Sequence, residues 1–244
     1  LKPVLRGRDI KRYQAEFADL WLITTFPSLN LDINRYPAIK RHLQSYGRKL
    51  HQTGEEFLDE NGNLVKTRKR TGNKWFETQD QIAYYEEFEK EKIVWAELAR
   101  TGNSFILDKG NYFTLAGTFI LTLGNEDLER ISYKYLVAML NHPTTLIYLE
   151  YVYSKLDVTG WQWKKEPFEK IPIPRAPQKD QQKIIAAYDS LVLASQNQRL
   201  EYLSKLDKLI FDYLGFTEEE IKHVFTKLKV FGKEEEYFNK NILS

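Results

Sequence analysis

The sequence predicts an α+β fold: a mixed, largely antiparallel sheet with packed helices, followed by a long C-terminal helix and a short final helix. Two features of the 244-residue chain indicate this class. Short β-branched and aromatic runs, separated by loops that contain Gly and Asn, follow one another between residues 93 and 123. Residues 178–214 instead place apolar side chains at helical spacing, without an interior Gly or Pro. An aromatic content of 14% is typical of a folded globular protein.

The first third of the chain is expected to contain a strand, a helix and a hairpin. Residues 20–26 are β-branched and aromatic and are followed by a proline, which predicts a buried strand. A helix should begin at about Tyr36, because Pro37 then lies in the first turn, where its missing N–H costs nothing. The Asn61-Gly62 pair between two apolar runs predicts a hairpin, since these residue types tolerate positive φ.

A meandering sheet and two helices are expected next. Strands are predicted at residues 93–98, 104–107, 112–116 and 118–123. Helices are predicted at residues 133–141 and 144–156. The alternating prolines of residues 171–174 require an extended chain, because proline fits neither a helix interior nor a central strand.

We expect the chain to divide into a body, residues 1–177, and a helical spacer with a C-terminal tail, residues 178–244. After the long helix, Thr217 and Glu220 have the spacing of a capping box, which predicts the start of the final short helix. The sequence leaves two roles open for the long helix. It can pair with a partner, or it can fold back as a brace on the body.

Several chemistries have no signal in this sequence. The chain has no cysteine, which excludes disulfides and thiolate metal sites and makes a reducing cytoplasm the expected compartment. No apolar run approaches the roughly 20 residues that span a membrane. There is no glycine-rich phosphate loop, HExxH or Gly-x-Ser-x-Gly motif, and the four histidines lack metal-ligand spacing. We therefore expect no catalytic, cofactor-binding or metal-binding residues here. The start at Leu1 suggests that the chain is an excised fragment.

Positive charge is concentrated in the first third of the chain. Residues 1–75 contain fifteen Lys and Arg against eight Asp and Glu, a balance of +7, whereas the net charge of the whole chain is +2. Five of these cations lie within the nine residues 66–74, which we call the basic loop. Such a loop is either solvated or bound to a polyanion, and we interpret the polyanion as double-stranded DNA.

Within the basic loop, the residue types suggest separate roles. Arg68 and Arg70 can each donate two hydrogen bonds to guanine, and Asn73 can bind an adenine edge. Trp75 can stack on a base or belong to the scaffold, whereas Trp95 is expected in the core. Phosphate contacts are expected from Lys66, Lys69 and Lys74. Further DNA contacts are predicted, less specifically, for Arg6, Arg8, Lys11, Arg12, Lys40 and Arg41.

Short motifs follow one another along nearly the whole chain. Residues 3–13 read PVLRGRDIKRY, residues 72–77 read GNKWFE, residues 88–95 read FEKEKIVW, residues 136–142 read LVAMLNH, and IPIP at 171–174 precedes QQKI at 181–184. Their order and spacing resemble the TaqI-like C-terminal specificity domain, the target recognition domain of type IIG restriction–modification enzymes and related adenine-N6 DNA methyltransferases. His142 departs from the family pattern, and the IPIP element is shared with type I specificity subunits.

The resemblance implies a domain that recognises a short duplex DNA sequence, mainly through the major groove. It implies a parent enzyme in which an upstream methyltransferase domain of the same polypeptide binds S-adenosylmethionine, with Mg²⁺ where an endonuclease is also fused. The target adenine would be flipped out of the base stack into that domain. The fragment itself is expected to be non-catalytic, with no membrane partner, and its long helix could mediate self-association.

Three other interpretations remain open at this point. In a type I specificity subunit, the long helix would pair with a second copy of the module. In a protein–protein interaction module, the basic loop would be incidental. A free-standing nuclease would need an acidic–lysine core, for which Glu220-Ile221-Lys222 is a poor match because it lies in the capping-box helix.

Overall fold

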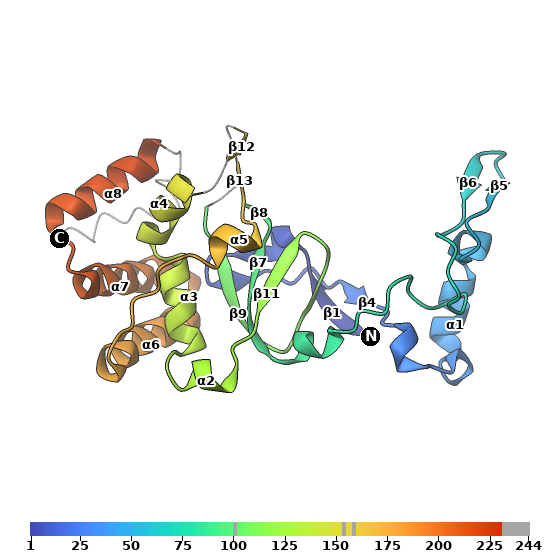
Figure 1. Ribbon diagram of the computed structural model, residues 1–244, viewed down its shortest axis with the longest axis horizontal. Coiled ribbons are helices and arrows are strands. Elements are labelled where there is room, and N and C mark those ends of the chain that lie inside the picture. Colours follow the sequence, from blue (N-terminus) through green and yellow to red (C-terminus); the bar gives the residue numbers. More distant parts are fainter. Residues whose placement is uncertain (100–101, 153–154, 158–159, 231–244) are drawn as a thin grey trace. The chain divides into compact units, whose positions relative to one another are not determined.

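The computed structural model describes residues 1–99, 102–152, 155–157 and 160–230 (Figure 1). The chain forms two compact units, which we describe separately. The first, here called the hairpin unit, consists of residues 1–3 and 21–87. The second, here called the sheet unit, consists of residues 4–20 and 88–244. Helices and small, mostly antiparallel sheets occur together, so the predicted α+β class is confirmed.

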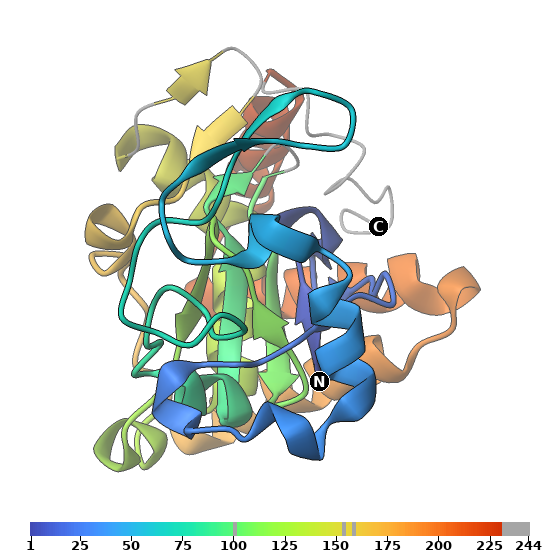
Figure 2. The same ribbon diagram turned by 90° about the vertical axis from the view of Figure 1, so that its right-hand side faces the viewer.

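The hairpin unit is built from short elements joined by irregular chain (Figure 2). Its strands are the first half of β1 (Lys2–Leu5), β4 (Trp21–Leu22), β5 (Glu56–Leu58) and β6 (Leu64–Lys66). Its helix α1 spans Pro37–Gln44, and 3₁₀ turns span Pro27–Leu29, Ile33–Arg35 and Gly47–Leu50, with a fourth, Tyr85–Glu89, at its end. Ile33, Leu43 and Phe76 form its buried core. The predicted helix and hairpin are both confirmed.

The buried strand predicted at residues 20–26 is wrong. Only Trp21 and Leu22 pair with a neighbour, the first two residues of β1. Trp21 is 54% exposed. β1 and β4 are antiparallel, so Leu22 lies opposite Lys2, the first residue of β1, and residues 23–26 continue beyond that end of the strand. Ile23 instead packs beside the small core of the hairpin unit.

An antiparallel three-stranded sheet lies at the centre of the sheet unit, in the order β11-β7-β9. These strands span Thr118–Leu121, Glu91–Ala96 and Phe105–Lys109. Trp95 pairs with Phe105 on one side and Phe119 on the other, and it is buried, as predicted. The third expected strand, β10 (Phe113–Thr114), leaves this sheet and pairs in parallel with β1.

Two smaller sheets complete the unit. One pairs β2 (Ile10–Lys11) with β3 (Gln14–Ala15), after a 3₁₀ turn at Gly7–Asp9. The other has the order β12-β13-β8 and consists of Lys155–Asp157, Gly160–Gln162 and Leu98–Ala99. The chain therefore changes sheets between Ala96 and Leu98.

Among the helices of the sheet unit, α3 packs against α4, α6 and β9, and so it lies between the strands and the later helices (Figure 1). In chain order they are α2 (Asn125–Leu128), α3 (Tyr133–Asn141), α4 (Pro143–Val152), α5 (Lys165–Phe168), α6 (Gln178–Leu193), α7 (Gln196–Leu214) and α8 (Glu218–Val230). The predicted helix over 144–156 instead ends at Val152, since residues 155–157 form β12. No helix among the described residues has the length and apolar content of a membrane span.

The single long helix predicted over residues 178–214 is wrong. The backbone of Ala194 and Ser195 is extended, which separates α6 from α7 and allows the two to pack against each other. Leu191 of α6 and Ile210 of α7 are then both fully buried in the core that also contains α3. Of the two roles left open for this segment, the structure thus shows the brace on the body. The functional division at residue 177 stays a prediction.

The capping box is present as predicted. The backbone N–H of Thr217 donates to Glu220 Oε2 at 2.7 Å, and the N–H of Glu220 donates to Thr217 Oγ1 at 3.3 Å. These bonds satisfy donors that the first turn of α8 would otherwise leave without partners.

A buried polar cluster joins the N-terminal segment of the sheet unit to its helices. The Arg12 guanidinium donates to both carboxylate oxygens of Asp207 on α7, at 2.8 and 3.0 Å, and to the carbonyl of Asn141. The Asn141 side chain in turn exchanges two hydrogen bonds with the backbone of Phe105. Burial raises the pKa of Asp207 to about 6, although Arg12 opposes that shift.

A second buried ion pair fixes the turn between β9 and β10. Lys92 and Asp108 are cross-strand partners in the sheet, and the Lys92 ammonium binds the Asp108 carboxylate. Asp108 also accepts the backbone N–H groups of Asn111 and Tyr112. Gly110, at φ +84°, closes this turn against the carbonyl of Glu89.

Replacing Gly110 with alanine is expected to destabilise the protein by about 3 kcal/mol or more. The new Cβ would lie 2.1 Å from the Glu89 carbonyl oxygen, so the backbone must move. Gly215→Ala is the matched control, because Gly215 has φ +75° and no neighbour within 4 Å. We expect the control to lose only about 1 kcal/mol of unfolding free energy, which is the cost of placing alanine in a left-handed backbone conformation. Urea unfolding measures both variants, and equal losses would contradict the steric argument.

His142 is expected to make stability depend on pH. Burial lowers its pKa from 6.5 to about 3. Its Nε2 lies 3.1 Å from the Asp207 carbonyl and its Nδ1 lies 2.7 Å from Thr144 Oγ1, so Nε2 carries the proton and Nδ1 accepts. Below pH 6.5 the unfolded chain binds a proton that the folded chain does not, and stability is lost as pH falls.

The measurement is the free energy of unfolding of wild type minus that of His142→Gln. The contributions of the other titrating groups are the same in both proteins and cancel in this difference. As pH falls from about 6.5 to 4, the wild type should lose about 1.4 kcal/mol per pH unit relative to the variant. A difference that stays constant with pH would show that His142 is protonated in the folded protein.

Candidate nucleic-acid interface

The β5–β6 hairpin presents the basic loop. Its tip is held by Asp59, whose carboxylate accepts the backbone N–H groups of Asn61 and Asn63 at 3.0 and 2.9 Å. These hydrogen bonds lower the pKa of Asp59 and keep it charged. Gly62 supplies the positive φ that the turn requires. The hairpin therefore has a defined shape although little apolar surface is buried on it: Leu58 and Leu64, which are cross-strand partners, are 67% and 68% exposed.

Arg68 holds the basic loop together from the inside. Its guanidinium donates to the backbone carbonyls of Leu50, Glu77 and Trp75, at 2.7, 2.9 and 2.6 Å. Partial burial lowers the pKa of Arg68 from its usual value. Three of its donors are thus committed to the protein itself, which assigns Arg68 to the framework of the loop. A contact between Arg68 and guanine stays a prediction, and the structure shows a different use of the side chain.

Two amide side chains, like Arg68, bind backbone carbonyls of the loop and the segment after it. Asn73 Nδ2 donates to the carbonyls of Thr78 and Gln79 at 2.9 and 3.1 Å. Gln52 Nε2 donates to the carbonyls of Lys74 and Glu77 at 3.1 and 2.8 Å. Trp75 is half-buried beside the core of the hairpin unit, which favours the scaffold role. The loop backbone is therefore held in place by its own side chains.

The remaining cations of the loop are on its outer side. Lys66, Lys69 and Arg70 are exposed, and Lys66 lies 3.9 Å from Glu56. The ammonium of Lys74 lies 3.5 Å from Glu77 Oε1 and 3.3 Å from Asn30 Oδ1, with half of the side chain exposed. On α1 of the same unit, Arg41 is exposed and Lys40 donates to Asn34.

The four N-terminal cations belong to the sheet unit, and two of them are used in folding. Arg6 forms a two-point ion pair with Asp9, at 2.9 and 2.7 Å, which lowers the pKa of that carboxyl. Arg12, whose side chain is 11% exposed, pairs with the buried Asp207, so its guanidinium is used in holding the fold together. Arg8 is exposed. Lys11 is 44% exposed and lies 3.7 Å from Glu16.

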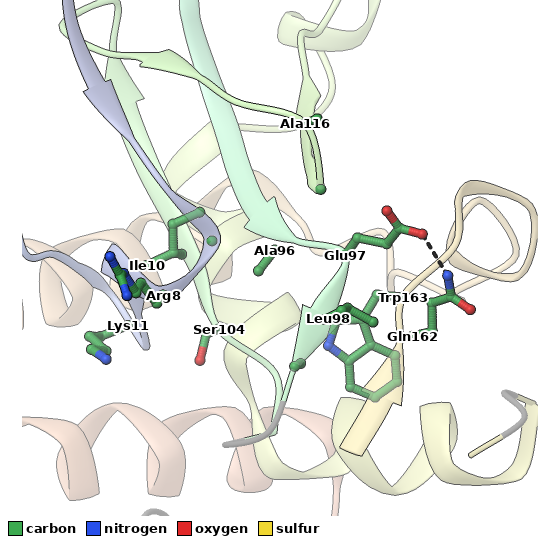
Figure 3. Close-up of a pocket in the computed structure, with 13 residues that line it drawn as sticks. Arg8, Ile10, Lys11, Ala96, Glu97, Leu98, Ser104, Ala116, Gln162 and Trp163 are labelled. Carbon is green, nitrogen blue, oxygen red and sulfur yellow. Dashed lines mark hydrogen bonds between the residues drawn. The ribbon is translucent and has the colours of Figure 1, made fainter. Parts of the chain in front are cut away.

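A cleft of about 490 Å³ lies in the sheet unit, next to Arg8 and Lys11 (Figure 3). Its walls are mostly apolar and come from the start of the unit, the crossover between β7 and β8, the β10–β11 turn and β13. A carboxylate and a carboxamide, Glu97 and Gln162, also line it. Neither residue has a signal in the sequence, because Glu97 lies inside an expected strand and Gln162 belongs to no motif. Among the described residues, no group of His, Asp and Glu is placed to hold a metal ion.

Arg68→Ala is expected to destabilise the hairpin unit by about 2 kcal/mol or more, because three carbonyls lose a charged donor. Lys69→Ala is the neighbouring control and should change stability by less than about 0.5 kcal/mol. Hydrogen exchange of the backbone amides in residues 67–77 measures the effect locally. Loss of protection in both variants, or in neither, would contradict the framework role of Arg68.

Comparison with protein families shows that the chain matches the TaqI-like C-terminal specificity domain over residues 2–173. The matched segment includes the whole hairpin unit and the sheets and first helices of the sheet unit. Curated proteins give no match.

Proposed function

Because the chain belongs to the TaqI-like C-terminal specificity domain family, a DNA sequence-specificity domain of restriction–modification systems, we propose that it positions a short duplex site for N6-adenine methylation. The methyltransferase would be an upstream domain of the same polypeptide, which would bind S-adenosylmethionine. Where an endonuclease is also fused, Mg²⁺ would act there too. The residues described above supply recognition rather than chemistry.

One observation carries the DNA-binding part of this proposal. The basic loop is held by neutral and charged groups of the protein itself, and it still presents Lys66, Lys69 and Arg70 outward. A loop that is already ordered loses little conformational entropy on binding. Exposed cations on a protruding hairpin suit the phosphates that flank a DNA groove.

We therefore assign separate roles to the outward cations. Lys66 and Lys69 bind phosphates, and Arg70 enters the groove, where its guanidinium can make two hydrogen bonds to guanine. Arg41 and Lys74 extend the phosphate contacts on the same unit, with Lys40 beside them. Arg8 and Lys11 provide a further positive region on the sheet unit.

The proposal predicts DNA binding that weakens steeply with salt. Lys69→Ala should lower affinity for all duplexes alike and reduce the slope of log K against log salt by about 0.9. Arg70→Ala should cost about 1–3 kcal/mol of discrimination at one base pair. Fluorescence anisotropy with specific and random duplexes measures both. Lys205→Ala is the control, because it removes an equal charge from α7, an element of the sheet unit.

Two outcomes would contradict the proposal at different points. A uniform loss of affinity in Arg70→Ala would show that Arg70 binds phosphate and does not read a base. No binding of any duplex at micromolar protein and low salt would favour the interaction-module alternative. The methylation step is tested on the enzyme that contains this chain, by transfer of labelled methyl groups from S-adenosylmethionine to adenine in DNA.

A further inference from the structure

The cleft of the sheet unit has the composition of a nucleotide-binding site. A volume of about 490 Å³ is within the range of small-molecule sites, which is roughly 300–1,000 Å³. Its apolar walls include Ile10, Ala96 and the indole of Trp163. Polar groups are few and lie in two places. Figure 3 shows Arg8 and Lys11 on one side of the cleft, and Glu97 with Gln162 on the other.

Glu97 is fixed at the point where the chain changes sheets. Its backbone N–H donates to the Gly117 carbonyl at 2.8 Å, and its carbonyl accepts the N–H of Trp163 at 2.7 Å. The Gln162 amide donates to the Glu97 carboxylate at 2.6 Å. The carboxylate is thus held in one orientation by both backbone and side chain, as a recognition group needs to be.

A carboxylate in a DNA-binding domain requires a specific partner, because it repels phosphates. The donors on bases that suit it are the exocyclic amino groups of cytosine, adenine and guanine. Arg8 and Lys11, at the opposite side, suit the phosphate that such a base carries. Together the two sides match a nucleotide in charge.

The shape of the site decides between two modes of base contact. A base in a duplex lies within a groove and is reached by a protein element that protrudes, as the β5–β6 hairpin does. A cleft instead receives a group that protrudes from its ligand. An unstacked nucleotide does so, once the few kcal/mol of unstacking have been supplied.

We propose that this cleft binds a single unstacked nucleotide whose base carries an exocyclic amino group, with Glu97 and Gln162 on the base edge and Arg8 and Lys11 on the phosphate. The nucleotide comes either from the bound DNA or from solution as a free mononucleotide. This inference rests on the proposed DNA-binding function, and it adds Glu97 and Gln162 to the residues that set specificity.

The test compares three duplexes of one sequence: fully paired, with one unpaired adenine, and with one unpaired thymine. The unpaired adenine should raise affinity about tenfold over the paired duplex, as expected when one base gains a stacking site. Thymine should raise it less. Competition by dAMP and by dTMP, each at millimolar concentration, forms the second arm and separates the two sources of the nucleotide.

Two variants address the cleft directly. Ala116→Leu fills it from the exposed β10–β11 turn and should abolish the preference for the unpaired adenine. Glu97→Leu removes the carboxylate acceptor and should reduce the adenine-over-thymine preference. Glu126→Leu, on the surface of α2, is the matched control and should leave that preference unchanged.

The outcomes separate this inference from the function on which it rests. If the paired duplex binds, but an unpaired base does not raise affinity and dAMP does not bind, the proposed nucleotide site is wrong. The proposed DNA-binding function is then unaffected. If Ala116→Leu retains the full adenine preference, the preference arises outside the cleft and the inference is overturned. If no duplex binds at all and dAMP does not bind either, both fail.

Discussion

The buried ion pair between Arg12 and Asp207 links positions 195 residues apart, and the closure of the sheet unit depends on it. Around it, Asn141 binds the backbone of β9, and His142 binds the carbonyl of Asp207. The N-terminal segment, the central sheet, α3 and α7 therefore meet at one polar cluster within an apolar core. A buried charge is tolerated only when it is paired, so these elements are constrained to one arrangement.

The hairpin unit uses the same principle on a smaller scale. Arg68 satisfies three carbonyls that would otherwise leave the basic loop without internal support. With that one guanidinium inside, the neighbouring Lys69 and Arg70 can be entirely outward. The five cations thus divide into one guanidinium that supports the loop and others that face outward, and this division follows from hydrogen-bonding capacity. A guanidinium has five donors in a fixed plane, whereas an ammonium is a compact and strongly hydrated charge.

The two units offer DNA two different shapes. The hairpin unit presents a protruding, positively charged loop, which suits the groove of a duplex. The sheet unit presents a cleft with apolar walls and polar groups at two sides, which suits a group that leaves the base stack. A specificity domain that contains both shapes can respond to the sequence of a site and also to its deformation.

The sequence by itself determined the features that depend on neighbouring residues. Proline at the start of α1, Asn61-Gly62 in the hairpin and the Thr217–Glu220 capping box were each readable, because turns and caps are satisfied within a few residues. The order of short motifs also determined the family. Tertiary structure decided where α6 ends, why residues 20–26 form almost no strand, and which arginines are inside. Those outcomes depend on partners far away in the chain: Asp207 for Arg12, and the single strand β1, whose length limits β4. Local pattern contains no information on such partners, so the same residue types lie outside in one place and inside in another.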